Sequence, residues 1–419
     1  MMRSMFSGVT GLRNHQVKMD VIGNNIANVN TVGFKKSRVT FQDTLSQTMR
    51  GAASPQGNRG GTNPMQVGLG MTIASIDTIH TSASAESTGN MTDLAIEGDG
   101  YFILQGDGLD KYYTRAGNFG FDTNGNLINT SNGLKVLGWQ ASDFKLPSDK
   151  SPQDIGPIQI RTGMVVPATA TSLVKFSKNL NAETGIDGTY SIPFKVYDSL
   201  GCAHNLSITF TKTGVDSNNN QSTWHFVIYD GNGNELQDNN AKGDIVFSGT
   251  GEYVSVNPSG EIQFNPGTGA APISFSVDFS GITQYAKETN VDMTYQNGYP
   301  AGTLTGITID TTGTITGIFD NGLSWKLAQV AIASFDNPAG LIKAGQNMYR
   351  SSNNSGEAQI GESGTGGRGT IAPGYLEMSN VDLSEEFTQM IITQRGFQAN
   401  SRIITVSDEM LQELVNIKR

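Results

Sequence analysis

The chain has 419 residues, of which 37% are apolar and 16% are charged, and it contains 51 glycines. This length allows two or three domains, and the richness in Gly, Asn, Ser and Thr suits short strands joined by tight turns. A formal net charge of -10 argues against a nucleic-acid partner. With a single cysteine the chain has no internal disulfide framework, and no apolar run approaches the roughly 20 residues that span a bilayer.

Residues 3–29 predict a helix with one apolar face. On that face apolar side chains recur every seven residues, which is the spacing of a helix that packs along its length against other long helices. The residues of this stripe are Met5, Leu12, Met19 and Ile26. The same segment has no apolar core like that of a cleaved secretory signal, so we expect an exported chain to leave the cell by another route.

The middle of the chain predicts β-structure, because short apolar runs alternate with turn signals such as Asn124-Gly125. Prolines between residues 147 and 157 mark a change to longer alternating strands, and the first pattern returns after about residue 286. We therefore interpret the middle segment as one β domain inserted within another. The predicted divisions are terminal helices at 1–32 and 380–419, an extended connecting segment at 33–75, a first β domain at 76–145 and 286–379, and an inserted outer β domain at 146–285.

The last helix is predicted to begin at Asp382, a capping residue, and to run to Lys418. At about 1.5 Å per residue the helix is roughly 55 Å long. An isolated helix of this kind, with Gly396 in its middle, would be only marginally stable in water. Its apolar stripe also repeats every seven residues, at Leu383, Met390, Phe397, Ile404 and Leu411. The two stripes predict chain ends that pack against each other and then against other copies, as in a self-assembling structural protein.

The sequence offers no catalytic, cofactor or metal site. Segments 122–126 and 230–234 begin like calcium-binding loops, but their sixth and twelfth positions are wrong for calcium, so we interpret both as hairpin tips. The four histidines lack the spacing of metal ligands. A different class, a secreted glycan-binding or hydrolytic β protein, would need a cleft with paired carboxylates and aromatic side chains. The three tryptophans, Trp139, Trp224 and Trp325, show no such grouping.

Several blocks of sequence match a known pattern. They are Gly8–Leu12, Met19–Lys35, Asp93–Phe102, Tyr113–Phe119, Gly374–Leu383 and Gln394–Asn400. Together they resemble the signature of the bacterial flagellar rod and hook family of axial proteins, at both ends of the chain and in the first β domain. The resemblance implies a mainly β multidomain subunit with an α-helical terminal coiled-coil region, without enzymatic activity or cofactor.

The inserted domain decides which branch of this family the chain resembles, because distal rod subunits lack a sizeable insertion. The resemblance favours a hook subunit, which would polymerise into a flexible hollow tube that transmits torque from rod to filament; a long distal rod subunit is the alternative. It implies export unfolded through the flagellar type III apparatus, an extracellular location in the flagellum, and chain ends that become ordered on assembly. The implied partners are other copies of the chain and the rod, hook cap and hook–filament junction proteins, with no nucleic acid and no membrane insertion.

Cys202 lies in a turn of the inserted domain, within residues 197–204. In spirochaete hook proteins, which this chain resembles, a cysteine of the outer domain is joined to a lysine of a neighbouring subunit through lysinoalanine. The resemblance makes Cys202 a candidate for such a cross-link, with Lys178 or Lys195 as the acceptor. The alternative is that Cys202 is a partly buried small residue without a chemical role.

Overall fold

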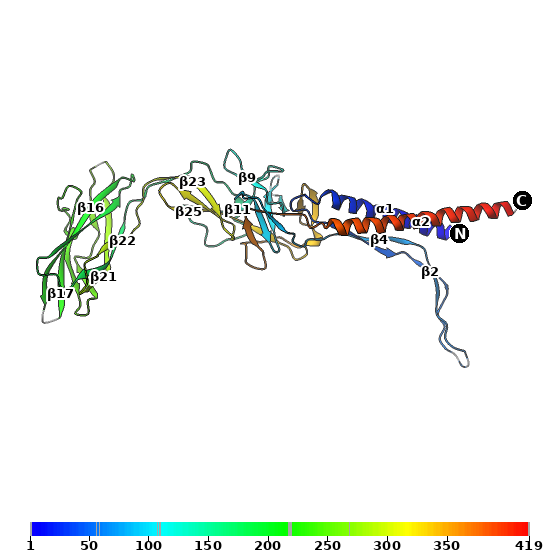
Figure 1. Ribbon diagram of the computed structural model, residues 1–419, viewed down its shortest axis with the longest axis horizontal. Helices are drawn as coiled ribbons and strands as arrows, with labels where there is room; N and C mark the ends of the chain where they lie inside the picture. Colours follow the sequence, from blue (N-terminus) through cyan, green and yellow to red (C-terminus); the bar gives the residue numbers. More distant parts are fainter. Residues whose placement is uncertain are drawn as a thin grey trace. The chain divides into compact units, whose positions relative to one another are not determined.

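Figure 1 shows the computed structural model, which describes residues 2–55, 57, 59–106, 108, 110–216, 220–267 and 269–417. These residues are mainly β, with an α-helix near each end of the chain, and this confirms the predicted fold class. They form two compact units. Unit 1 comprises Met1–Arg161, Ile307–Thr316 and Trp325–Arg419, and unit 2 comprises Thr162–Gly306 and Gly317–Ser324. Unit 2 overlaps the predicted inserted domain, and the four-part division of the chain stays a prediction.

The two long helices of unit 1 lie side by side (Figure 1). They are α1, Met2–Ala27, and α2, Leu383–Ile417. They run antiparallel, because Gly8 near the start of α1 packs against Ile404 of α2, while Asn25 near its end bonds to Glu386. The predicted last residue of the second helix, Lys418, lies outside the described residues.

The start of α2 is fixed by a side-chain cap. The carboxylate of Asp382 accepts hydrogen bonds from the backbone N–H of Ser384 (2.8 Å) and of Glu385 (3.3 Å). These bonds satisfy N–H groups that have no partner within the helix. The side chain of Glu385 forms an ion pair with Lys36 at 2.7 Å, which ties the first turn of α2 to the segment after α1.

A six-stranded sheet forms the centre of unit 1. In sheet order its strands are β27 (Ile342–Gly345), β28 (Met348–Arg350), β8 (Lys111–Thr114), β7 (Tyr101–Gln105), β26 (Ile332–Ser334) and β29 (Gln359–Gly361). A short helical turn, η2 (Pro338–Gly340), precedes β27. Buried aromatic side chains hold the sheet together, since Phe335 packs edge-on against both Tyr101 and Tyr113.

Further strands of unit 1 form ribbons and a three-stranded group. Three ribbons pair strands that are near each other in the sequence: β1 (Ser37–Asp43) with β4 (Met71–Thr78), β2 (Ser46–Arg50) with β3 (Met65–Gly68), and β9 (Phe119–Phe121) with β10 (Leu127–Asn129). Two ribbons pair distant strands: β5 (Ala85–Ser87) with β31 (Tyr375–Glu377), and β6 (Leu94–Glu97) with β30 (Thr370–Pro373). The three-stranded group is β12 (Gly156–Pro157), β11 (Leu137–Gln140) and β25 (Ser324–Val330), which are consecutive strands of a six-stranded sheet. Because β5 pairs with β31 and β6 with β30, segments from the two halves of the chain meet at the base of the helices.

Unit 2 contains a two-sheet sandwich, on which Figure 1 labels β16, β17, β21 and β22. One sheet has the order β15 (Thr189–Tyr197), β16 (Ala203–Asp216), β17 (Gln221–Tyr229), β18 (Lys242–Phe247) and β19 (Tyr253–Asn257), with η1 (Asn239–Ala241) before β18. The other has the order β20 (Ile262–Phe264), β21 (Ile273–Tyr285), β14 (Leu173–Asn181) and β22 (Asp292–Gln296). Outside the sandwich, β13 (Val165–Val166) pairs with β23 (Gly302–Ile309), and β24 (Thr314–Phe319) follows β23 along the chain.

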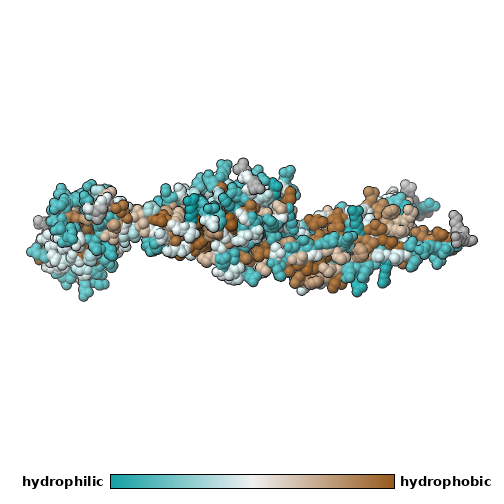
Figure 2. All heavy atoms as spheres, turned by 90° about the horizontal axis from the view of Figure 1, so that it is seen from above, coloured by the Kyte–Doolittle hydropathy of each residue, from teal (hydrophilic) through white to brown (hydrophobic). Residues whose placement is uncertain are grey.

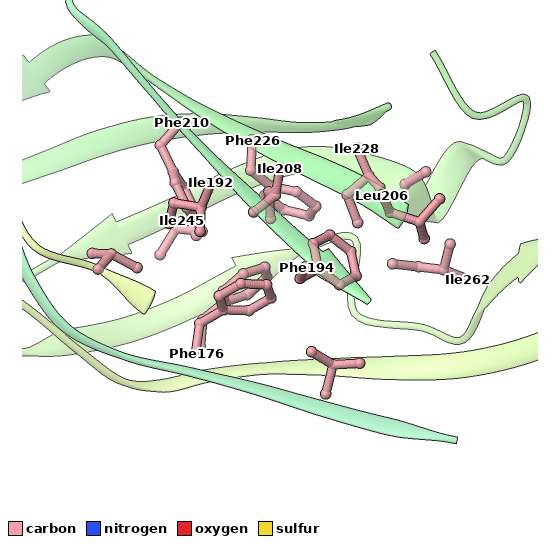
Figure 3. Packing of buried hydrophobic residues seen from close by; sticks show 14 of the residues in the cluster. Phe176, Ile192, Phe194, Leu206, Ile208, Phe210, Phe226, Ile228, Ile245 and Ile262 are labelled. Carbon is pink, nitrogen blue, oxygen red and sulfur yellow. The ribbon is translucent and has the colours of Figure 1, made fainter. Parts of the chain in front are cut away.

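The sandwich core follows from strict alternation of side chains along the strands. In β17 every second residue is buried, so Trp224, Phe226 and Ile228 face inward. Figure 3 shows the aromatic and branched side chains of both sheets meeting in this core. Phe176 of β14 stacks on Phe279 of β21 with ring centroids 5.9 Å apart. The inward residues are bulky and apolar, which is the pattern of a β-sandwich core.

Four hairpin tips share one turn. In each, an aspartate carboxylate accepts hydrogen bonds from the backbone N–H groups two and four residues later, and the glycine three residues later has a positive φ. The four aspartates are Asp122, Asp198, Asp230 and Asp310. Hydrogen bonds from Asn126 and Asn234 lower the pKa of Asp122 and of Asp230 respectively. The two calcium-like segments are therefore hairpin tips, as predicted, and their carboxylates bind backbone amides.

Candidate assembly interface

The contact between α1 and α2 is made by small and polar residues. The buried residues are Gly8, Gly11, Asn14, Ile22 and Asn25 on α1 and Glu386, Thr393 and Ser407 on α2. A Cβ atom added to Gly11 would lie 2.7 Å from Cγ of Asn400, and one added to Gly396 would lie 2.9 Å from the ring of His15. Glycine at these positions therefore allows the two backbones to approach closely.

The buried amide side chains of this contact, Asn14 and Asn25, are hydrogen-bonded. The Asn25 side chain accepts a hydrogen bond from the Ser37 N–H at 3.0 Å and donates to the Ser37 carbonyl at 2.8 Å. It also donates to the carboxylate of Glu386 at 3.2 Å. Asn14 donates to the carbonyl of Met71 at 2.7 Å. Such directional bonds fix how far α1 slides along α2 and where both helices meet β1 and β4.

The two predicted stripes lie at the edges of this contact. All members of the α1 stripe are half-buried, and so are all members of the α2 stripe except the first. The half-buried residues are Met5, Leu12, Met19, Ile26, Met390, Phe397, Ile404 and Leu411. Leu383 is exposed. On α2 the half-buried stripe alternates with the small and polar residues of the buried contact, which stand three or four positions away. Whether the stripe residues become fully buried between subunits stays a prediction.

A second apolar face of α2 is not covered by α1. Its exposed residues are Ile392, Ile403, Val406, Met410, Leu414 and Ile417. Successive members of this set from Ile403 onward stand three or four residues apart, so they share one side of the helix. Near the start of α1, Met2, Phe6 and Val9 are also exposed. Figure 2 shows these helices as a region with much apolar surface, whereas the surface of unit 2 is mostly hydrophilic.

The ribbon formed by β2 and β3 is a further uncovered apolar surface, and every residue of both strands is exposed. The register pairs Gln47 with Val67, and strand alternation places Leu45 and Leu69 on the same face. Leu45 is 79% exposed. A two-stranded ribbon without cover is marginally stable in water at best. The ribbon and the outer face of α2 together give unit 1 an unusually large apolar surface for a single chain.

A buried ion cluster anchors the helices to the β-structure of unit 1. The Lys35 amine lies 2.7 Å from one carboxylate oxygen of Glu377, and the Arg115 guanidinium lies 3.3 Å from the other. Lys35 also donates to the carbonyl of Thr81 at 2.7 Å, and the N–H of Ala83 donates to Glu377 at 3.0 Å. These contacts join the segment that follows α1, the residue that follows β8, and β31, the last strand before α2.

The surroundings of this cluster are tightly packed. Gly33, with φ +68°, lies against the backbone of Ala116, where a Cβ atom would be 2.6 Å from the amide nitrogen. The Arg115 guanidinium lies over the ring of Tyr101 at 5.1 Å, and the Tyr101 hydroxyl is 2.8 Å from Nδ1 of His80. Burial, with the charges of Lys35 and Arg115, lowers the pKa of His80 to about 4, so this histidine is neutral at pH 7.

The candidate cross-link residues all lie in unit 2. Cys202 is exposed and not partly buried, and whether it has a chemical role stays a prediction. Its backbone N–H donates to the carboxylate of Asp198 at 2.9 Å, and the same carboxylate lies 3.0 Å from Nε2 of His204. Lys178 is exposed and pairs with Asp292 of the same chain at 3.2 Å. Lys195 is exposed on β15, in the edge strand of its sheet.

Neither a metal centre nor a membrane span emerges from the structure. Among the described residues, no three side chains of His, Cys, Asp or Glu are grouped as metal ligands would be. Within the same residues, neither helix combines the length and the apolar character required to cross a membrane.

Sequence reasoning predicted that the two helices meet, but it missed the small and polar residues that form their contact, and it missed the ion cluster. A search for apolar repeats passes over Gly8, Gly11 and Thr393, because these residues carry little hydropathy signal. A signal was nevertheless present, since Gly396 sits in the interior of a long helix, where glycine is unfavourable unless close packing requires it. Lys35 and Glu377 were within the matching sequence blocks, but nothing local indicates that residues so far apart in the chain meet.

Models of protein families match four segments of the chain. The model described as "Flagella basal body rod protein" matches residues 5–35, and "Flagellar basal body rod FlgEFG protein C-terminal" matches 372–417. The model "Flagellar hook protein FlgE/F/G D1 domain" matches residues 95–175, and "Flagellar basal body protein FlaE D2 domain" matches 165–299.

Individual proteins are similar to this chain along its whole length. The flagellar hook protein FlgE of Borreliella burgdorferi is 42% identical over 453 residues, and that of Treponema pallidum is 41% identical over 472 residues, with 100% of both chains covered in each case. The flagellar basal-body rod protein FlgG of Bacillus subtilis is 35% identical over 421 residues, again with 100% of both chains covered. The solved structure of Helicobacter pylori FlgE2 covers 70% of this chain and 100% of its own, with a TM-score of 0.55 and 17% identity, which shows a shared fold.

The glycine contact between the helices can be tested with a matched pair of substitutions. We expect Gly11→Gln to lower the free energy of unfolding of the helix pair by about 1–3 kcal/mol, because the new side chain overlaps Asn400. Gly23→Gln should be neutral or stabilising by up to about 1 kcal/mol, since Gly23 of the same helix has no atom within 4 Å of its Cβ position. Urea unfolding followed by circular dichroism at 222 nm measures both, and equal effects would contradict the close contact.

The ion cluster can be tested by removing one charge. Glu377→Gln leaves Lys35 and Arg115 buried without a counter-charge, so we expect a loss of about 3–5 kcal/mol in the free energy of unfolding of unit 1. Glu385→Gln removes the carboxylate of the Lys36 ion pair, whose Glu385 side chain is 56% exposed. The loss there should stay below about 1 kcal/mol. Urea melts of the two variants provide the comparison, and similar losses would show that burial of the cluster contributes nothing.

Proposed function

Because the chain belongs to the flagellar hook protein family, we propose that its copies assemble through the exposed apolar surfaces of unit 1. The chain is a structural subunit of the flagellar hook, a part of the bacterial flagellum that serves motility. The main support for this assembly mechanism is the outer face of α2, whose apolar residues are exposed over several turns in the single chain. A soluble monomer rarely keeps such a face exposed unless a partner covers it.

Burial of this face would supply the free energy of assembly. Each large apolar side chain that moves from water into a contact contributes about 1.5–3 kcal/mol. The outer face of α2, the start of α1 and the β2–β3 ribbon together offer enough such side chains to offset the entropy lost when a subunit docks. The half-buried stripes that begin at Met5 and Leu383 lie beside these surfaces and would extend the contact between copies.

The role of unit 2 in the polymer is proposed to differ from that of unit 1. Its surface is mostly polar, and its apolar residues form an interior core (Figures 2 and 3). Polar surfaces form contacts that break and re-form at low cost, because water replaces each lost hydrogen bond. Such contacts suit a curved tube whose subunits slide past one another as it rotates and transmits torque.

The remaining assignments extend the family membership to partners and location. We propose that the polymer contacts the rod, the hook cap and the hook–filament junction proteins, and that the chain reaches its place outside the cell through the flagellar export apparatus, without a cleaved signal peptide. The proposed role is mechanical, with no catalytic activity. The family membership is what supports the export route.

The hook assignment and the apolar face are tested together in cells that carry only a variant chain. Ile403→Asp combined with Val406→Asp places two charges in the proposed contact, where burial of a charge costs several kcal/mol. We expect basal bodies with complete rods and no hook, seen by electron microscopy. Gln398→Asp, on a different side of α2, should leave hooks intact. A shortened rod would identify a rod subunit instead, and normal hooks in the double variant would exclude this face.

A covalent link between subunits is a second proposal, supported by the exposure of Cys202 at a hairpin tip. Loss of the Cα proton and of hydrosulfide from Cys202 leaves a dehydroalanine. The uncharged amine of Lys178 or Lys195 from another copy then adds to its Cβ atom, and a proton returns to Cα. The atoms balance without an oxidant, and the product is lysinoalanine.

Denaturing gel electrophoresis with reductant tests the link in assembled hooks. We expect a ladder of multimers that survives boiling, and its collapse to monomer in Cys202→Ala hooks. Lys178→Arg and Lys195→Arg, which keep the charge but remove the amine nucleophile, identify the acceptor because only one should abolish the ladder. A clean monomer band from the unmodified protein would exclude the cross-link.

A further inference from the structure

His15 is a titratable residue within the contact between α1 and α2. Two of its ring atoms, Cε1 and Nε2, lie 2.9 Å from the position that a Cβ atom of Gly396 would occupy. The ring also packs edge-on against Phe41 of β1, with ring centroids 5.7 Å apart. The imidazole therefore lies where α1, α2 and β1 meet, and its charge bears on all three elements.

The Nδ1 atom of His15 is buried and has no hydrogen-bond partner among the described residues. In a neutral imidazole one ring nitrogen carries a proton, whereas in the charged form both do, and the ring bears a full positive charge. A protonated His15 would therefore place a charged donor in this contact without an acceptor. Such a group costs more to bury than the neutral ring.

The charges near the ring do not compensate for a proton on it. On α1, Lys18 stands one turn away, and on α2, Arg395 precedes the glycine that the ring contacts. Both are cationic. On β1, Asp43 is exposed to water, where its charge is screened. Burial, and then the charge of Lys18, lower the pKa of His15 below its usual value of 6.5.

We infer that protonation of His15 opens the contact between α1 and α2, so that mild acid weakens assembly of the chain. This inference deepens the proposed homopolymer and rests on it. The paired helices present their outer apolar faces together, and separation of the pair removes the surface on which copies are proposed to dock. His15 would then act as an acid-sensitive switch within the subunit, distinct from the contacts between copies.

The direction of the pH dependence follows from the lowered pKa. His15 takes up a proton less readily in the folded chain than in the unfolded chain, so acid favours the separated helices. The contact has its full stability above about pH 6.5 and loses stability as the pH falls from there through the lowered pKa. Carboxylates, whose ordinary pKa values are near 4, stay charged over most of this range.

The other three histidines of the chain have different surroundings. His80 takes up a proton only near pH 4. His204 and His225 belong to unit 2, and their ring nitrogens lie 3.0 Å from Asp198 and 2.8 Å from Asp244 respectively. A proton on either of these two rings gains a counter-charge, so mild acid does not weaken unit 2 in the same way.

Urea unfolding followed by circular dichroism at 222 nm tests the contact in the full chain. We expect the urea midpoint of the helix signal to fall when the pH is lowered from 7.5 to 5.5. In His15→Gln, which takes up no proton in this range, the midpoint should stay unchanged. His225→Gln in unit 2 is the matched control and should keep the pH dependence of the unmodified chain. His15→Asn, a smaller neutral side chain, is the second variant and should lose it as well.

Polymerisation of the same chains connects the contact with assembly. We expect the critical concentration of the unmodified chain to rise at least about threefold between pH 7.5 and 5.5, and that of His15→Gln to stay within about twofold. A urea midpoint that does not shift, or that shifts equally in His15→Gln, would overturn the inference.

The two measurements separate this switch from the proposed function. Chains that stay monomeric at both pH values while the urea midpoint shifts as expected would overturn the homopolymer and leave the opening of the helix contact supported. Polymerisation that is insensitive to pH while the midpoint shifts would overturn the effect of His15 on assembly and leave the homopolymer in place.

Discussion

The buried cluster of Lys35, Glu377 and Arg115 is the constraint on which the arrangement of unit 1 depends. A charge buried without a partner costs several kcal/mol, so Lys35 and Arg115 both depend on the carboxylate of Glu377, which pairs with each of them. Since Lys35 follows α1 and Glu377 precedes α2, the cluster brings the two ends of the chain to one point of the β-structure. Both helices leave from this point, and their outer faces are thereby presented together.

The helix pair uses different chemistry inside the chain and outside it. Between α1 and α2 lie Gly11, Asn25 and Thr393, which offer little apolar area but a close fit and directional hydrogen bonds. The larger apolar residues, such as Val406 and Met410, point away from this contact and are exposed. This is the reverse of an ordinary helix pair, whose apolar side is buried within the fold. The inner contact thus sets the register of the two helices, and the exposed apolar residues remain available for the proposed contacts between copies.

Local patterns in the sequence predicted the helices, the hairpin tips and the strands of the sandwich. The reason is physical: alternation along β17 and the Asp-x-x-Gly turns are determined by residues within a few positions of each other. The apolar stripe of α2 lies at the edge of the contact with α1, and the small residues of that contact carried no hydropathy signal. The ion cluster and the parallel pairing of β14 with β21 join distant segments, and nothing near either partner indicates the match. Non-local contacts of this kind limited what the sequence could predict about the interface.

The division between directional and non-directional contacts also bears on how a tube of such subunits bends. Hydrogen bonds weaken steeply when the distance or the angle between donor and acceptor departs from its optimum, so the hydrogen-bonded cluster around Glu377 makes unit 1 stiff at the base of its helices. Apolar contacts depend on buried area and change little when two surfaces slip slightly against each other. In the proposed polymer the apolar contacts of α2 therefore tolerate small slips, while the larger sliding movements are proposed for the polar surface of unit 2, and each subunit keeps its internal geometry. The proposed tube would then bend through small movements between copies, while each copy stays rigid.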